Sequence, residues 1–113
     1  MHELSVTQNI IDIVVQHAER ARSKQINTIS LVIGELTGLV DDSIQFYFDM
    51  ISPTTLAAGA RLVIHRVPTR LRCRSCSSDY QPVDLNWMCP QCGALGGDVL
   101  AGREFLVESI EVE

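Results

Sequence analysis

The stretches Cys73-Arg74-Ser75-Cys76 and Cys89-Pro90-Gln91-Cys92 decide how this chain is organised, and they hold all four of its cysteines. Two residues between the members of each pair let one tight turn direct both sulfur atoms at a single ion. Two such turns supply four soft ligands in a closed tetrahedron, which is the preference of structural Zn²⁺. We therefore predict one structural zinc site with the ligands Cys73, Cys76, Cys89 and Cys92.

Other uses of the cysteines fit the spacing less well. Two disulfides are not expected in an intracellular chain, because the cytosol keeps thiols reduced. A redox dithiol is usually a single Cys-x2-Cys pair beside a βαβ unit. A catalytic zinc keeps an open coordination position, and four protein ligands leave none. An iron–sulfur or rubredoxin-like iron centre stays open as an alternative, since iron also accepts four thiolates.

The segment around the cysteines is short and poor in apolar residues. Segments of fewer than about 40 residues rarely fold alone without a metal or another cross-link. Zinc binding can supply on the order of 10–16 kcal/mol of apparent free energy to such a module. Pro68 precedes the segment, and several glycines follow its second cysteine pair. We therefore divide the chain into an α+β domain, residues 1–69 and 99–113, and a zinc-binding insert, residues 70–98.

The sequence outside this insert predicts two helices. Ser5-Val6-Thr7-Gln8 matches a capping box, and the apolar spacing after it indicates a helix over about 6–22. Asp41-Asp42-Ser43 offers N-cap candidates for a second helix over about 42–51. The stripe of the first helix that we expect to face the core is Val6, Ile10, Ile13, Val14, His17 and Ala21.

Three further segments predict strands, over residues 29–33, 62–67 and 105–113. Both faces of the second strand hold apolar residues, so we expect it to be central. The third strand closes the chain and is expected to rejoin the same sheet. The fold class we predict is α+β, with two helices on one face of a small sheet of about three strands. The cysteine segment would be an inserted zinc-ribbon or rubredoxin-like unit with four cysteine ligands.

Met1 and His2 form a second candidate metal site. The α-amine of Met1, the amide nitrogen of His2 and the His2 imidazole can close two small chelate rings in one plane, and Glu3 could supply a fourth donor. Planar nitrogen and oxygen ligands favour Ni(II) or Cu(II). Because the amide must lose a proton, affinity should fall at lower pH. By themselves these residues are a weak signal, since a histidine beside a start methionine is usually a solvated tip.

Other polar residues have simpler structural explanations. His17 lies on the expected inner stripe of the first helix, so we expect it to be packed or to act as a cap. His65 lies within a strand and is expected to be structural. Asp41 and Asp42 could approach the N-terminal site, but helix capping explains them more simply.

Composition and charge exclude several classes of protein. The 113 residues are 46% hydrophobic and 20% charged, which is typical of a folded globular chain rather than a disordered one. No apolar run reaches the roughly 18 residues that a membrane span needs. The first residues lack the features of a secretory signal, so we expect a cytoplasmic protein. We find no GxxxxGK(S/T) phosphate loop and no nucleophile–base pattern, so we do not expect an enzyme.

A nucleic-acid-binding module is one alternative. The net charge of −5 argues against it, because such proteins are normally basic. An acid-free stretch over residues 50–78 nevertheless carries arginines that could contact phosphates. These arginines are Arg61, Arg66, Arg70, Arg72 and Arg74.

Several motifs, in order along essentially the whole chain, resemble the HypA/HybF family of hydrogenase nickel incorporation proteins. They are Met1-His2-Glu3-Leu4-Ser5, Ile33-Gly34-Glu35-Leu36 with Gly38, the two cysteine pairs, and Ile110-Glu111-Val112-Glu113. The resemblance implies a nickel metallochaperone that helps deliver Ni(II) to the large subunit of NiFe-hydrogenase. It also implies a partner GTPase of the HypB type, and some members support urease maturation. Neither nucleic acid nor a membrane is an implied partner.

The resemblance also assigns the metal ligands. Nickel would be held by the α-amine of Met1 and by His2 with Glu3 close by, and zinc by the four cysteines. Some relatives carry histidines beside the cysteine pairs that are thought to make the zinc site respond to pH. This chain has Ser77-Ser78 and Gly93-Ala94 there, so no such response is expected. A structural zinc adaptor without a nickel role is the remaining alternative.

Overall fold

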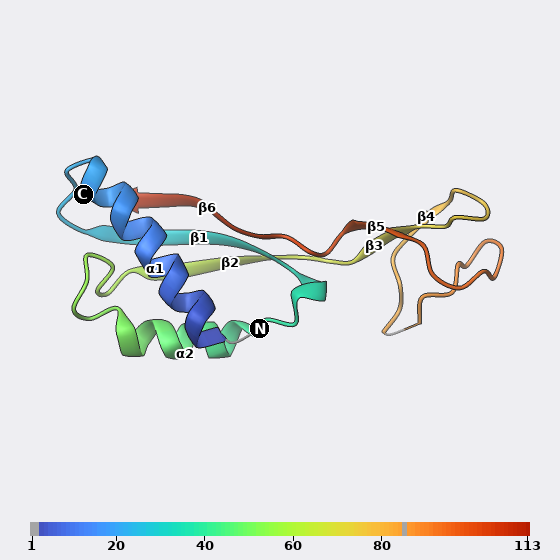
Figure 1. Ribbon diagram of the computed structural model, residues 1–113, viewed down its shortest axis with the longest axis horizontal. Helices are drawn as coiled ribbons and strands as arrows, with labels where there is room; N and C mark the ends of the chain where they lie inside the picture. The colour runs from blue at the N-terminus through green and yellow to red at the C-terminus, as the bar shows by residue number, and fades with distance from the viewer. Residues whose placement is uncertain (1–2, 85) are drawn as a thin grey trace.

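The computed structural model describes residues 3–84 and 86–113. The molecule is elongated, with extents of 55 × 24 × 17 Å (Figure 1). One end holds both α-helices and a three-stranded sheet, and the other end holds a smaller three-stranded sheet beside the four cysteines. The elements of the first end are α1 (Glu3–Arg20), β1 (Ile26–Gly34), the short 3-10 helix η1 (Glu35–Thr37), α2 (Asp41–Ile51), β2 (Arg61–Val67) and β6 (Phe105–Val112). Those of the second end are β3 (Arg70–Arg72), β4 (Asp79–Tyr80) and β5 (Asp98–Ala101).

The larger sheet has the order β2-β1-β6, so β1 is its central strand. β1 pairs in parallel with β2 and antiparallel with β6, which confirms that the closing segment rejoins the sheet. The prediction that residues 62–67 form a central strand is wrong, because β2 lies at the edge. Its two apolar faces misled the prediction, since only the face with Leu62 and Ile64 packs against the core. The alternate residue Val63 lies on the other face of the sheet.

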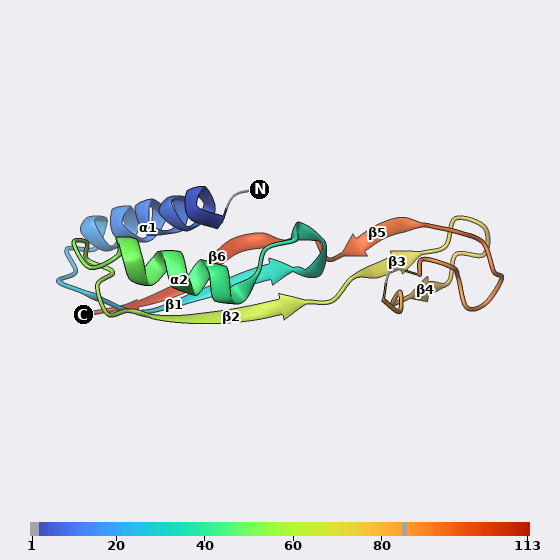
Figure 2. The ribbon, with the colours of Figure 1, turned by 90° about the horizontal axis from the view of Figure 1, so that it is seen from below.

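Both helices cover the same face of this sheet, as predicted (Figure 2). The buried face of α1, however, is rotated from the predicted stripe. Thr7, Ile11 and Ala18 are buried, whereas Ile13, His17 and Ala21 are exposed. The sequence could not fix the rotation, because Ile10, Ile11, Ile13, Val14 and Val15 make one side of the helix almost continuously apolar.

The predicted helix caps are wrong for both helices. The capping box at Ser5 does not form, because α1 already includes Glu3, and the Thr7 hydroxyl donates to the Glu3 carbonyl inside the helix at 2.6 Å. In α2 the N-cap is Val40, and no side chain caps the helix. Asp41 lies in the first turn of α2, where a carboxylate suits the positive end of the helix dipole.

Two segments of the chain, around Thr69 and around Gly102, connect the two ends of the molecule, and η1 contacts both of them. The Glu35 carboxylate accepts a hydrogen bond from the Thr69 backbone N–H at 3.2 Å. The Leu36 N–H donates to the Gly102 carbonyl at 2.7 Å. A Cβ on Gly34 would collide with the Gly102 backbone, so only glycine fits there. These contacts hold the small sheet beyond the point where β1 ends at Gly34.

A separate hydrophobic cluster stabilises each end. The larger cluster lies between the helices and the sheet and includes Ile29, Leu31 and Phe48, all of them essentially inaccessible to water. The smaller one contains Leu71 and Tyr80 together with two of the cysteines. Within the part of the chain that the structure describes, no helix is both long and apolar enough to cross a membrane.

Candidate metal centre

The four cysteine sulfurs converge on one point beside the small sheet. Their ligand atoms all lie within 4.8 Å of one another. The Sγ atoms of Cys73 and Cys92 are 3.5 Å apart, and those of Cys76 and Cys89 are 3.6 Å apart. A zinc ion with Zn–S bonds of about 2.3 Å places its sulfurs about 3.8 Å apart at the corners of a tetrahedron. The separations therefore fit a metal, and they are far longer than the roughly 2.05 Å of a disulfide.

Each cysteine pair sits on the same type of backbone turn. The Cys73 carbonyl accepts from the Ser77 N–H at 2.9 Å, and the Cys89 carbonyl accepts from the Gly93 N–H at 2.9 Å. Ser77 and Gly93 both adopt left-handed conformations, with φ of 64° and 79°. Glycine suits this conformation at Gly93, and Ser77 makes the equivalent turn without being glycine.

A second hydrogen bond completes each turn. The Cys73 N–H donates to the Ser78 carbonyl at 2.9 Å, and the Cys89 N–H donates to the Ala94 carbonyl at 2.8 Å. Sequence reasoning missed Ser78 and the role of Ser77. Superposing the two Cys-x2-Cys pairs on their cysteines would have found both, since Ser77 and Ser78 then align with Gly93 and Ala94.

The surroundings fix one half of the cluster more firmly than the other. Cys73 and Cys89 are buried, while Cys76 and Cys92 are exposed. Beneath the buried pair, the Tyr80 hydroxyl donates to the Trp87 carbonyl at 2.6 Å and ties β4 to the second turn. This anchoring holds the two turns facing each other, with one side of the cluster open to solvent.

Electrostatic interactions among the four cysteines favour binding of a cation. Hydrogen bonds from the Ser78 hydroxyl and then the Ser78 backbone lower the pKa of Cys76 to about 6. The Ala94 backbone favours ionisation of Cys92, but the bond to Cys73, burial and the other thiols outweigh it and raise the pKa of Cys92 to about 12. Four thiolates therefore do not coexist without a balancing charge, which a divalent metal would supply.

The predicted nickel ligands are described only in part. Met1 and His2 lie outside the described residues. Glu3 is the first residue of α1 and is half-buried. Asp41 forms an ion pair with Arg66, at 3.3 Å between carboxylate oxygen and guanidinium nitrogen, and Asp42 is exposed. In residues 3–84 and 86–113, the four cysteines are the one cluster of metal-ligating side chains.

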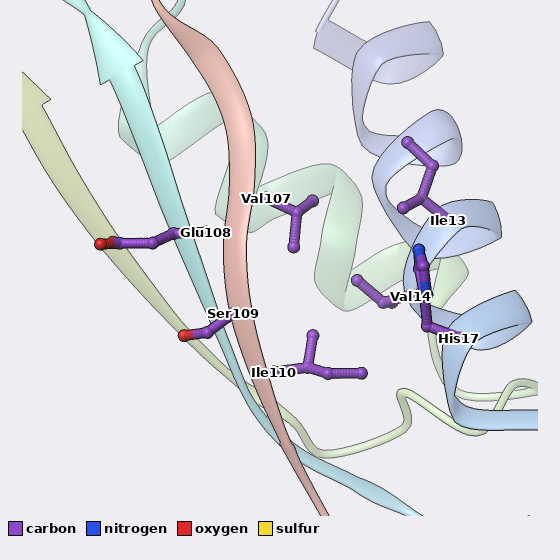
Figure 3. A pocket seen from close by; sticks show the side chains of 7 residues that line it. All are labelled: Ile13, Val14, His17, Val107, Glu108, Ser109 and Ile110. Atoms are coloured by element: carbon purple, nitrogen blue, oxygen red, sulfur yellow. The ribbon is translucent and has the colours of Figure 1, made fainter. Parts of the chain in front are cut away.

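Both remaining histidines are exposed. The prediction that His17 is packed is wrong, because it is exposed and lies beside a groove next to β6 (Figure 3). It does lie in the last turn of α1, where a basic residue suits the negative end of the helix dipole. His65 alternates with the core-facing Ile64 along β2 and lies on the sheet face opposite the helices.

Three of the five arginines in the acid-free stretch pair with acids from other segments. Besides Arg66 with Asp41, Arg72 pairs with Asp79 at 2.8 Å, and Arg74 pairs with Asp98 at 2.9 Å. Side-chain pairing of this kind competes with phosphate contacts. These pairings therefore weaken the nucleic-acid alternative.

Comparison with known proteins places the chain in a family. A family model described as "Hydrogenase/urease nickel incorporation, metallochaperone, hypA" matches residues 1–112. The chain is 42% identical over 113 residues to "Hydrogenase maturation factor HypA" of Dehalococcoides mccartyi, covering 100% of this chain and 95% of that one. It is 42% identical over 114 residues to the protein of the same name in Caldanaerobacter subterraneus, covering 100% of both.

Solved structures show the same fold. One is described as the solution structure of the Ni metallochaperone HypA from Helicobacter pylori, with a TM-score of 0.66 at 24% identity over 99% of this chain and 97% of that one. A second, described as the solution structure of HypA protein, has a TM-score of 0.71 at 24% identity over 100% and 97%. With the family match across residues 1–112 and relatives at 42% identity, the chain belongs to the HypA family of nickel incorporation metallochaperones for hydrogenase maturation.

Proposed function

We propose that this chain carries Ni(II) at its N-terminus and delivers it to the large subunit of NiFe-hydrogenase, while its four cysteines hold a structural zinc ion. The observation that carries the proposal is the contrast between the two ligand sets. The described cluster is made of four sulfurs, which suits a resident zinc. Residues Met1-His2-Glu3 offer nitrogen and oxygen donors instead, in a chain whose family is defined by nickel incorporation.

The nickel ligands in this proposal are the α-amine of Met1, the amide and imidazole nitrogens of His2, and the carboxylate of Glu3. Square-planar nitrogen and oxygen ligation suits Ni(II). Delivery would require that a receiving site exchange its own ligands for these donors. A partner that offers softer ligands, such as thiolates, would then displace them.

We further propose that the two ends of the molecule work as separate units. Residues 1–69 and 99–113 would form the nickel-binding domain, and residues 70–98 the zinc-binding insert. Two distinct hydrophobic clusters and two separate sheets support a division of this kind, with β5 extending the small sheet to Ala101, three residues past the proposed boundary. When bound, zinc would supply cross-linking, and the residues of β3, β4 and β5 would keep the two cysteine turns in place around it.

Delivery requires partners with chemistry that this chain lacks in sequence. No GxxxxGK(S/T) motif is present, so nucleotide hydrolysis would come from a maturation GTPase of the HypB type. The family description also names urease, so urease maturation proteins are further candidate partners. In this proposal the chain is a carrier and not an enzyme, and its cytoplasmic location stays a prediction.

Calorimetric titration of untagged protein with Ni(II) tests the proposal. We expect His2→Ala, and separately a single residue added before Met1, to weaken nickel binding at least tenfold while zinc content stays at one per chain. His17→Ala is the matched control, because His17 is an exposed histidine on α1 that the proposal gives no role in nickel binding. Equal nickel affinity in the His2→Ala variant and the untagged wild type would contradict the proposal.

A further inference from the structure

A groove of about 290 Å³ runs between α1 and the outer edge of β6. Ile13, Val14 and His17 line it from the helix, and residues 107–110 line it from the strand. Figure 3 shows Val107 and Ile110 pointing toward the helix, with Glu108 and Ser109 pointing away from it. Apart from His17, the side chains that face each other across the groove are therefore apolar. Glu108 and Ser109 lie on the opposite, polar face of β6.

The edge of β6 beside this groove has no strand neighbour in the described sheet, where β6 pairs with β1 alone. Such an edge presents a row of backbone N–H and C=O groups that another strand can pair with. A register shift between Ser30 and Leu31 marks a bulge near Glu108. The bulge places Glu108 and Ser109 on the same side of the strand, as Figure 3 shows.

The negative charge along this edge favours a basic binding partner over a second copy of the chain. Exposed acids follow one another along the end of the chain at Glu108, Glu111 and Glu113. If a second copy of the chain added its own β6 here, these acids would face acids, and like charges on neighbouring strands are destabilising. A strand that carries lysine or arginine would gain from the same positions.

We propose that this groove docks an extended segment of a partner protein, which pairs with the free edge of β6 as an additional strand. Its apolar side chains would contact Ile13, Val107 and Ile110, and its alternate basic side chains would face Glu108 and Glu111. Main-chain pairing supplies affinity in this mode of recognition, and alternate side chains supply specificity. The inference goes beyond nickel carriage and does not depend on it.

Ile13 supplies the apolar surface on the helix side of the groove that such a segment would contact. Its side chain is 45% exposed although it faces the groove, so it has apolar surface left to bury. The side chains of Val107 and Ile110 are half-buried and already pack against the core. An added strand would cover the Ile13 surface without repacking the protein.

The experiment uses the full chain, isotopically labelled, and a seven-residue peptide that alternates lysine and valine. Amide chemical shifts in a nuclear magnetic resonance titration give both the site and the affinity. We expect saturable shifts concentrated on β6 and on α1 around Ile13. Ile13→Gln should weaken binding about tenfold, whereas Phe46→Gln should not change it, because Phe46 is exposed on α2 away from the groove.

Two further arms test pairing and charge. A peptide with a central proline, which lacks the N–H needed for pairing, should bind at least tenfold more weakly. The double variant Glu108→Gln with Glu111→Gln should lose severalfold in affinity, and the control Asp42→Asn with Asp49→Asn on α2 should lose none. The proposal is overturned by shifts centred elsewhere, by equal binding of a glutamate–valine peptide, or by no saturable binding. A dimer formed through β6 without peptide would also overturn it.

Discussion

The two ends of this molecule are stabilised in different ways. The end with α1 and α2 buries a continuous aliphatic and aromatic cluster against its sheet. The end with the cysteines buries only Leu71, Tyr80 and the two inner cysteines. The first end has an ordinary hydrophobic core, whereas the second buries so little apolar surface that we expect it to need a metal to fold. The difference indicates that metal removal and core mutation should affect different halves of the chain.

Loss of the metal should have the largest effect. We expect Cys89→Ala to remove zinc and unfold residues 70–101, because zinc supplies on the order of 10 kcal/mol to modules of this size. Amide signals of the α+β end should keep their positions in the same spectrum. Ser75→Ala, an exposed change inside the first turn, is the control and should keep its zinc. A Cys89→Ala variant with an ordered cysteine end would contradict the comparison.

Truncation in the larger core should come next. Phe48 is 1% exposed between the helices and the sheet. Phe48→Ala should lower the free energy of unfolding by about 3–5 kcal/mol, as large-to-small core changes do. Denaturant unfolding measures the loss, and zinc analysis of the folded variant should still give one ion per chain. Zinc loss from folded Phe48→Ala protein would show that the two ends are not independent.

The junction between the ends should respond more weakly. In Gly34→Ala the new Cβ would meet the backbone at Gly102, so the two crossing segments must separate. We expect a loss of about 1–3 kcal/mol, as for overpacked sites. Gly38→Ala is the control, because Gly38 has a positive φ but open space around it. Thermal unfolding should therefore rank Gly34→Ala below Gly38→Ala, and the reverse order would contradict a tight crossing.

The smallest effect should come from the exposed pair of Arg72 and Asp79. The hydrogen bond from Arg72 lowers the pKa of Asp79 below its usual value. A depressed carboxyl pKa adds stability above the unfolded value of about 3.9, and this stability is lost as pH falls through the folded value. The difference in melting temperature between wild type and Asp79→Asn should thus be the same at pH 7 and pH 5. A difference that disappears between pH 7 and pH 5 would mean that the pKa of Asp79 is raised rather than lowered, which would contradict this prediction.

The sequence predicted the parts of this molecule that local chemistry decides. Two Cys-x2-Cys pairs can converge on one ion whatever surrounds them, so the cluster followed from spacing. The return of the last strand to the sheet also followed from local patterns. The fold class was therefore predictable before any tertiary contact was known.

What the sequence did not predict depends on contacts between distant residues. The rotation of α1 is set by packing against α2 and the sheet, and one side of the helix is too uniformly apolar to show it. The edge position of β2 depends on which face of the sheet the helices cover. Arg66 and Asp41 are far apart in sequence, so their ion pair gave no local signal. The ligands Met1 and His2 remain a prediction from sequence and family.

The most direct test asks whether nickel and zinc occupy different ligand sets. It records X-ray absorption spectra of the protein loaded with both metals, at the nickel edge and at the zinc edge. We expect zinc to show four sulfur neighbours at about 2.3 Å. Nickel should show nitrogen and oxygen neighbours that include an imidazole, and this imidazole signal should vanish in His2→Ala. Nickel surrounded by sulfur, with no imidazole in its shell, would contradict the proposal that carriage belongs to the N-terminus.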